Sequence, residues 1–359
     1  MKLKNRKPKD NTPLKLLAGA LLFFGLFVFL ITRPSKQSEA MKELDLCYNS
    51  SEVRKIWDKY KTELHQDEEF LFQLRSRLST FNLGDSEIEK CRQWLPPAPE
   101  SINVIVIPDL SRRITDTYNN PNQVQNDIFI LQNIWSSFAD YSKLKQDSKD
   151  KLIVDLTDID QAQGQFGKVA NNLQFDLSGH KGKSNRLFFT DEKQKQFSKS
   201  VIEMYKLGRE KPLGADYRFY LRRYLKSHIK KSTLFDTYRN KVIFITDGYL
   251  EAEISGIDTK IDDPKIKSML YKSVQNGNVL DIISSNKLNI PIVNIDLTNT
   301  DVMVCEINER KTGKGYDYEI LKTYWEDWFQ RMRVKSIEVL QREQATASTA
   351  IKVKEFILK

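Results

Sequence analysis

Histidine and cysteine are scarce in this chain, which contains three of each among its 359 residues. The histidines are His65, His180 and His228, and none has a partner at the spacing of a zinc site. Three cysteines are too few for a small fold that disulfides hold together. No Ser/His/Asp or Cys/His constellation can be named from these residues, so the sequence predicts no catalytic residues of that kind.

The chain also lacks a large excess of positive charge outside its N-terminal segment. The 57 Lys and Arg residues outnumber the 48 Asp and Glu residues and give a net charge of +9. Six basic residues and only Asp10 lie in the first fifteen positions, so +5 belongs to that segment and +4 to the rest. A nucleic-acid partner is therefore not expected. The 40% share of apolar residues is sufficient for a folded core.

One long hydrophobic run occurs near the start of the chain, at residues 16–31. Extended to residues 14–32, it predicts a transmembrane helix of about 25–28 Å, close to the roughly 30 Å hydrocarbon core of a bilayer. The basic tail at residues 1–13 predicts a cytoplasmic N-terminus. We therefore expect a signal-anchor in a single-pass protein of the bacterial inner membrane, with its main domain periplasmic or otherwise extracytoplasmic. The alternative is a cleaved signal peptide with its cleavage site at residues 38–40.

Residues 41–95 predict a helical membrane-proximal element. Ser50 and Ser51 are suitable N-cap residues, and apolar side chains then recur at helical spacing. Cys47 and Cys91 lie at ends that a helical hairpin brings together, so a disulfide is expected in an oxidising compartment; two buried thiols are the alternative. The proline-rich residues 96–100 form a stiff linker to the next domain.

From residue 101 onward, apolar runs alternate with helical patterns. The strongest strands are expected at 102–107, 241–246 and 290–295, with weaker ones at 152–156, 187–189 and, as an edge strand, 302–306. Helices are expected at 122–145, 191–207, 215–231, 263–285 and 317–342, before a C-terminal tail at 344–359. The pattern predicts an α/β fold: a doubly wound, mainly parallel, Rossmann-like sheet with helices on both faces.

Two aspartates follow the two strongest strands of this predicted sheet. Asp109 and Ser111 come after 102–107, and Asp247 comes after 241–246. Ligands of open parallel sheets bind beyond the carboxyl ends of the strands, where the loops converge. Carboxylate and hydroxyl oxygens are ligands that hard cations prefer. The three residues therefore predict a site for such a cation.

The order of these motifs resembles the von Willebrand factor type A domain over residues 101–343. The resemblance lies in a buried strand ending in Asp-x-Ser and a later strand ending in Thr-Asp-Gly. It implies a binding domain with a metal-ion-dependent adhesion site, which holds Mg²⁺ or Mn²⁺ and accepts a carboxylate from a partner. Asp109, Ser111 and Asp247 match the family's ligands.

Two ligand positions of the family have lost their oxygen in this chain. Arg113 stands where the family has a second Ser, and Ala215 stands at the position of a Thr, with Asp216 following it. In one interpretation, Arg113 replaces the metal and pairs with Asp109 and Asp247. In the other, Arg113 swings outward and Asp216 or water completes a weakened metal site. The adhesion site is therefore predicted to be at least partly degenerate.

The segment Tyr217–Lys231 mixes aromatic residues with Arg and Lys at helical spacing. A helix with one buried face and a solvated basic face is the simplest interpretation. Binding of nucleic acid or anionic lipid is the alternative.

We predict a membrane-anchored protein–protein interaction module that serves in adhesion, scaffolding or envelope-complex assembly. Its partners are expected to be proteins, and no enzymatic activity is expected. The alternative is a metal-dependent phosphodiesterase or other hydrolase that uses strand-end aspartates, with Asp155, Asp158 or Asp296 joining Asp109 and Asp247.

Overall fold

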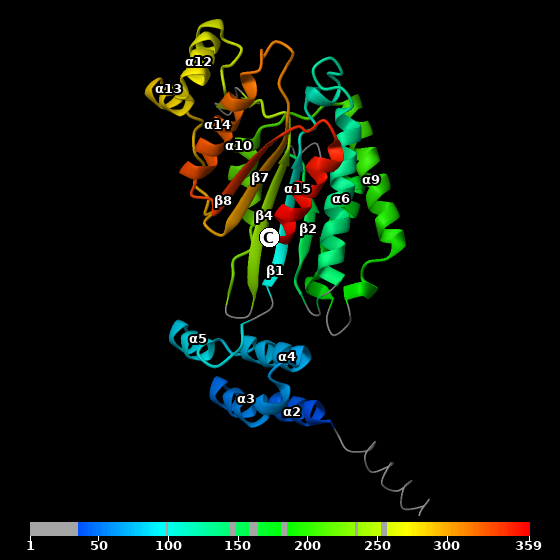
Figure 1. Cartoon of the computed structure of the whole chain (residues 1–359). Coiled ribbons are helices and arrows are strands. Elements are labelled where there is room, and N and C mark those ends of the chain that lie inside the picture. The colour runs from blue at the N-terminus through cyan, green and yellow to red at the C-terminus, as the bar shows by residue number, and fades with distance from the viewer. Residues whose placement is uncertain are drawn as a thin grey trace, which may run out of the picture. The chain divides into compact units, whose positions relative to one another are not determined.

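The computed structural model describes residues 35–97, 100–143, 145, 148–157, 164, 166–180, 185–233, 236–252 and 257–359 (Figure 1). The chain divides into two compact units, residues 1–96 and 97–359, and each is described by itself. The predicted anchor at 14–32 lies outside the described residues. Within the described part of the chain, no helix has both the length and the apolar character to cross a membrane.

The described residues of the first unit, 35–96, form four helices, where the sequence predicts a helical element. They are α2 Lys36–Asp45, α3 Ser50–Leu64, α4 Glu68–Ser79 and α5 Asp85–Arg92. Asn49, rather than a serine, caps α3 by accepting a hydrogen bond from the backbone N–H of Glu52. The apolar stripe of α3 packs with α4 around Trp57 and Phe70, whose rings stack at 6.4 Å.

Cys47 and Cys91 are both buried in this unit and carry free thiols, as does Cys305 in the second unit. Burial raises the pKa of the Cys47 and Cys91 thiols. The disulfide between Cys47 and Cys91 stays a prediction.

The second unit is built on a six-stranded sheet, and the predicted α/β fold with a mainly parallel sheet flanked by helices is confirmed. The strand order is β3-β2-β1-β4-β7-β8, and only β3 runs antiparallel to its neighbour. The strands are β1 Glu100–Pro108, β2 Lys151–Val154, β3 Gln174–Asp176, β4 Thr237–Ile245, β7 Thr300–Ile307 and β8 Ser336–Gln341. A separate two-stranded ribbon pairs β5 Glu251–Ala252 with β6 Ile257–Asp258.

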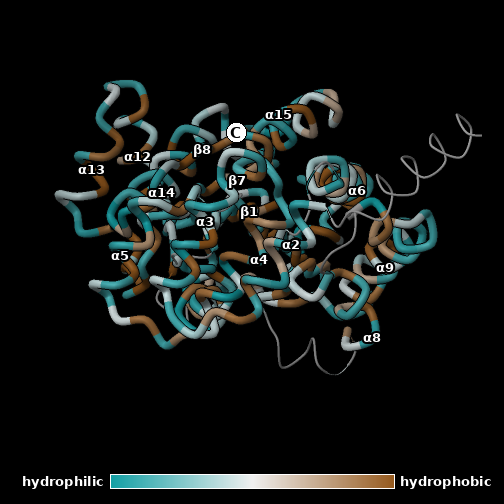
Figure 2. Tube along the Cα trace, turned by 90° about the horizontal axis from the view of Figure 1, so that it is seen from below, coloured by the Kyte–Doolittle hydropathy of each residue, from teal (hydrophilic) through white to brown (hydrophobic). Residues whose placement is uncertain are grey.

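Helices cover both faces of the sheet because alternate strand residues point to opposite sides. Val104 and Val106 of β1 join one core with α6 Gln123–Lys143, α9 Asp191–Glu210 and α15 Thr346–Leu358. Ile105 and Ile107 join the opposite core. That core also contains α10 Tyr217–Tyr220, a π-helical turn at Leu221–Leu225, α12 Pro264–Asn276, α13 Val279–Ser285 and α14 Asp317–Arg331. Hydrophobic and hydrophilic residues alternate along these helices, as expected for helices with one buried side (Figure 2).

The strand predicted at 290–295 is wrong, and the edge strand predicted at 302–306 is an inner strand. Ile290 and Val293 are buried, but this segment forms no ladder. Pro291 has no N–H to donate to a neighbouring strand, and its carbonyl instead accepts a hydrogen bond from Trp328 Nε1. The strand beside β4 is therefore β7, which lies between β4 and β8.

The C-terminal predictions also need correction. The helix expected at 317–342 ends at Arg331, and Arg333 adopts a left-handed φ of 59° before the chain enters β8. The expected tail at 344–359 instead contains helix α15, which buries Val353 and Ile357. Thr349 of α15 donates a hydrogen bond to the buried Glu306 at the end of β7 (3.0 Å).

Two further predicted elements, at 187–189 and 263–285, also differ from the structure. The strand expected at 187–189 is absent, and a 3₁₀ turn occupies Asn185–Leu187. The helix expected at 263–285 is divided into α12 and α13 at Gly277, whose left-handed φ of 67° ends the first helix.

Candidate functional site

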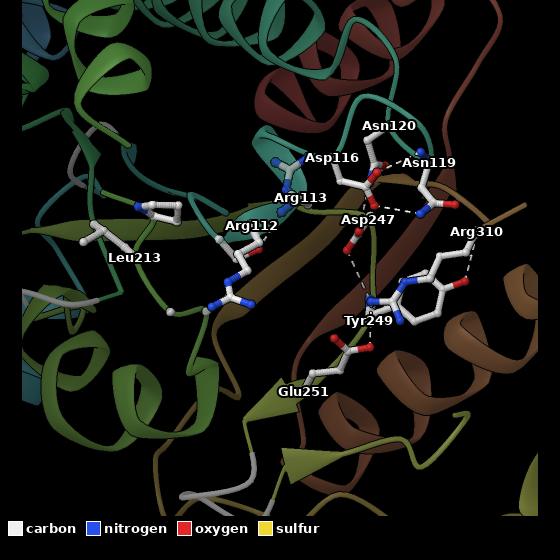
Figure 3. Close-up of a pocket in the computed structure, with 14 residues that line it drawn as sticks. Arg112, Arg113, Asp116, Asn119, Asn120, Leu213, Asp247, Tyr249, Glu251 and Arg310 are labelled. Atoms are coloured by element: carbon white, nitrogen blue, oxygen red, sulfur yellow. Dashed lines mark hydrogen bonds and ion pairs between the residues drawn. The ribbon is translucent and has the colours of Figure 1, made fainter. Parts of the chain in front are cut away.

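The candidate site lies where the strand order of the sheet reverses. From β1 the chain builds outward through β2 and β3, and from β4 it builds in the other direction through β7 and β8. Asp109 follows β1 and Asp247 follows β4, so both lie at this switch point, where open α/β sheets bind ligands. A cleft of about 640 Å³ opens here (Figure 3). Its walls come from residues 111–120, 212–215 and 247–251 and from Arg310.

Asp109 is buried, and protein donors occupy both of its carboxylate oxygens. Oδ1 accepts a hydrogen bond from the backbone N–H of Ser111 at 2.9 Å. Oδ2 accepts one from the Thr246 hydroxyl at 2.8 Å and lies 3.3 Å from Nε of Arg113. Three protein groups therefore occupy most of the acceptor positions of this carboxylate.

Arg113 supplies the positive charge of the site, and its side chain is only 2% exposed. Its Nη2 group pairs with Asp127 Oδ2 at 2.7 Å and donates to the carbonyl of Ile245 at 2.9 Å, while Nε donates to the carbonyl of Asp109 at 3.1 Å. Burial by itself lowers the pKa of Arg113. The negative charges of Asp127 and Asp109 raise this pKa by more than burial lowers it, so the guanidinium stays charged. Arg113 therefore ties the end of β1 to the end of β4 and to α6.

Asp127 is the functional residue that the sequence analysis missed. It lies on the buried side of α6 and accepts hydrogen bonds from Gln123 Nε2 at 2.5 Å and from the Tyr205 hydroxyl at 3.0 Å. Burial raises its pKa to about 6, although Arg113 opposes that shift. The available signal was an acidic residue placed among the apolar positions of the predicted helix 122–145.

Asp247 lies nearby but forms no ion pair with Arg113, so the expected pairing of Arg113 with both strand-end aspartates is only half present. Asp247 is 5% exposed, and its contacts are long: 3.4 Å from Asn120 Nδ2 and 3.4 Å from the backbone N–H of Tyr249. Burial, followed by repulsion from Asp109, raises its pKa to about 6.

A polar cover from two distant loops lies over Asp247. Asn308 Nδ2 donates to the carbonyl of Asn119 at 2.8 Å and to Asn120 Oδ1 at 3.1 Å. Beside it, the Arg310 guanidinium stacks 3.9 Å from the Tyr249 ring centre and pairs with Glu251 at 2.6 Å (Figure 3). These contacts hold one wall of the cleft in place.

The remaining predicted metal ligands do not converge on one position. Ser111 serves the turn that follows β1, because its hydroxyl oxygen accepts from the backbone N–H of Arg113 at 3.5 Å. Asp216 caps α10 by accepting from the backbone N–H of Phe219, and it lines a neighbouring cleft with Asp262 and Asp263. Ala215 has no side-chain oxygen to offer.

Asp109, the first predicted metal ligand, has little acceptor capacity left for a hard cation. The carboxylate of Asp109 already carries a guanidinium at 3.3 Å and a hydroxyl donor at 2.8 Å. Across the described ranges, no three His, Cys, Asp or Glu side chains are grouped to hold a metal ion. A site for Mg²⁺ or Mn²⁺ stays a prediction.

Arg112 differs from its neighbour Arg113 in every respect that matters for binding. Its side chain is exposed, lines the cleft and extends in the opposite direction to that of Arg113 (Figure 3). Within the described part of the protein, Arg112 has no ion-pair partner. It is therefore a cation that an incoming ligand can reach.

The aspartates of the hydrolase alternative lie apart from this cleft. Asp155 follows β2 and contacts His228 Nε2 at 2.9 Å and the Tyr220 hydroxyl at 2.8 Å. Asp296 precedes β7, which places it near the amino edge of the sheet, and Asp158 lies outside the described residues.

No protein-family model, curated protein or solved structure matches this chain. The likeness to the von Willebrand factor type A domain stays a prediction that depends on Asp109, Ser111 and the Thr246-Asp247-Gly248 strand end. Function is therefore inferred from the residues at the switch point.

Proposed function

We propose that this protein is a membrane-anchored, extracytoplasmic interaction module with a von Willebrand factor type A-like domain. It binds a protein partner at the switch-point cleft and does so without a divalent cation. The observation that carries the proposal is the buried Arg113, which lies between Asp109 and Asp127 at the position where the family pattern has a ligand hydroxyl.

A built-in arginine makes the metal unnecessary for the fold. Two buried carboxylates need compensating charge, and a guanidinium provides it together with several directed hydrogen bonds. Since Arg113 is covalently part of the loop after β1, its positive charge lies beside these two carboxylates at any concentration of Mg²⁺. The domain then keeps its binding surface assembled in the absence of metal.

Arg112 is the residue through which this cleft recognises its partner. In the family that the sequence resembles, the metal accepts a carboxylate from the partner, whereas here the exposed guanidinium of Arg112 lines the cleft. An acidic side chain of a partner protein suits the guanidinium of Arg112.

The biological role remains adhesion, scaffolding or assembly of an envelope complex. The hydrolase alternative has no comparable support, because Asp155 and Asp296 are engaged away from the cleft. Membrane anchoring and orientation depend on residues 1–32. A reporter fused after residue 40 that is active only in the cytoplasm would overturn the orientation.

Site-specific photo-cross-linking of the full-length protein in its own membrane tests the proposed partner site. A photoreactive residue replaces Tyr118, which is 64% exposed and lies between the cleft residues Asp116 and Asn119. The matched control replaces Ile202, which is 52% exposed on α9. We expect a discrete protein adduct at position 118 that Arg112→Glu abolishes. An adduct that survives Arg112→Glu, or equal adducts at both positions, would contradict partner recognition through Arg112.

A further inference from the structure

A second charged surface lies on the segment that follows the cleft loop. Residues 217–233 contain six Lys and Arg residues and no Asp or Glu. Their apolar side chains, including Tyr217, Tyr220 and Leu225, are buried against the sheet. Arg222, Arg223, Lys226 and Lys231 are exposed, and together we call them the basic face.

The backbone of this segment departs from a regular helix where the basic face begins. Leu221–Leu225 forms a π-helical turn between α10 and α11 Lys226–His228. The two consecutive arginines, Arg222 and Arg223, lie within this turn and both face solvent. Short π-helical turns are rare and occur frequently at functional sites.

The basic face lacks the local compensation that helix α3 of this protein has. On α3, Lys59 pairs with Glu43 and Lys61 pairs with Asp58. In the described part of the chain, no residue of the basic face forms an ion pair. Like charges at helical spacing repel one another, so this surface is stabilised by an anionic partner.

The basic segment ends at the edge of the sheet where the chain enters the domain. The carbonyl of His228 accepts a hydrogen bond from Asn103 of β1, and the backbone N–H of Lys230 donates to Asn240 of β4. Asn103 and Asn240 are register partners near the amino ends of their strands. The chain, which carries the predicted anchor before the helical unit, enters β1 at Glu100 at this same edge.

We propose that the basic face docks on the anionic phospholipid headgroups of the membrane that holds the anchor. This inference rests on the membrane anchoring in the proposed function. A tether keeps the domain near the bilayer, and clustered Lys and Arg residues are attracted to an anionic leaflet within about a Debye length. An acidic protein partner is less favoured, because the tether already supplies an anionic surface at high local concentration.

The test measures contact between one labelled position and the bilayer. Full-length protein is reconstituted in nanodiscs of phosphatidylcholine alone or of phosphatidylcholine mixed with phosphatidylglycerol. A fluorophore is attached at Ser227→Cys, an exposed position between Lys226 and His228, and quenching by headgroup spin-labelled lipid is measured. The native cysteines are buried, so they compete poorly for the label. Gln196→Cys on α9, the helix on the opposite face of the sheet, is the matched control.

We expect several-fold stronger quenching at position 227 than at position 196 in anionic discs, and no difference between them in neutral discs. High salt abolishes the difference, since the contact is electrostatic. The triple variant Arg222→Gln/Arg223→Gln/Lys226→Gln abolishes it as well. The control variant Lys195→Gln/Lys199→Gln, with exposed lysines of α9 removed, retains it. Thermal unfolding of each variant shows that the fold is kept.

Several outcomes would overturn the proposal. Equal quenching at position 227 in neutral and anionic discs would do so, as would quenching that the triple variant retains. Protection of the label by poly-glutamate, without any effect of anionic lipid, would assign the basic face to an acidic protein instead. A chain that elutes separately from the discs would overturn the anchor and the docking together. An anchored chain without quenching at position 227 would overturn the docking alone.

Discussion

Asp109 and Asp247 follow neighbouring parallel strands at the same edge of one sheet, yet their surroundings differ. Asp109 accepts hydrogen bonds from Ser111 and Thr246 and contacts Arg113 at 3.3 Å. Asp247 has two hydrogen bonds of 3.4 Å and no ion pair among the described residues. The difference shows that Arg113 compensates the negative charges of Asp109 after β1 and Asp127 on α6. The negative charge of Asp247 after β4 has no such compensation among the described residues.

Among the substitutions at these two strand ends, removal of Arg113 is expected to lower the free energy of unfolding most. Arg113→Met leaves Asp109 and Asp127 buried without their cation, which costs about 3–5 kcal/mol of the free energy of unfolding. Chemical denaturation of the full-length protein measures this loss. Arg112→Met is the control, and its effect stays within about 0.5 kcal/mol because its side chain is exposed and has no ion-pair partner among the described residues. Equal losses in the two variants would contradict the structural role of Arg113.

Loss of the Asp109 carboxylate is expected to have the next largest effect. Asp109→Asn removes the negative charge that faces Arg113 and turns one acceptor oxygen into a donor beside Thr246 or Ser111. We expect about 2–3 kcal/mol of destabilisation, measured by chemical denaturation at pH 7. A change smaller than that of Asp247→Asn would reverse the comparison between the two aspartates.

Asp247→Asn, unlike Asp109→Asn, is expected to raise the free energy of unfolding at pH 8. Burial raises the pKa of Asp247 to about 6 in the folded protein, against an ordinary value of 3.8. A raised pKa means that the folded state binds the proton more tightly, so this group favours folding most below pH 4 and loses that contribution as pH rises through 6. At pH 8 the substitution therefore stabilises the protein by roughly 1–3 kcal/mol, and at pH 4 the gain vanishes. Denaturation curves at both pH values measure this, and destabilisation at pH 8 would contradict it.

The smallest effect on stability, with the largest effect on binding, is expected for Arg112. Arg112→Gln leaves the unfolding free energy within about 0.5 kcal/mol of the wild type, because the described residues give Arg112 no ion pair to lose. It weakens the cross-link formed from position 118, because the cation available to a partner's carboxylate is gone. Arg112→Lys retains part of the cross-link through its charge. A cross-link of the same yield in every Arg112 variant would contradict partner recognition through Arg112.

The sheet was predictable where the physical pattern is unambiguous. The strands around 102–107 and 241–246 are continuous β-branched and aromatic runs buried on both faces, and the structure has β1 and β4 there. The interpretation of 290–295 as a strand failed because Pro291 cannot join a ladder, although the apolar residues around it are buried. Strand β8 was not predicted, because its apolar residues follow closely on those of α14 and were interpreted as part of the same helix.

The site was predictable only in its local part. Strand-end positions brought Asp109, Ser111 and Asp247 to one edge of the sheet, as the doubly wound pattern requires. Asp127 lies 14 residues from Arg113 on another element, and a single acidic residue in an amphipathic helix does not reveal its partner. The cover formed by Asn120 and Asn308 joins loops 188 residues apart, which local periodicity cannot indicate.

Thermal unfolding of the full-length protein with Mg²⁺, Mn²⁺ or EDTA tests the central claim most directly. A cation that binds only the folded state at one hundred times its Kd adds about 2.7 kcal/mol of stability, which is readily seen as a rise in Tm. We predict the same Tm in all three conditions, because Arg113 already compensates Asp109 and Asp127. A metal-dependent rise in Tm that Asp109→Ala abolishes would contradict the account.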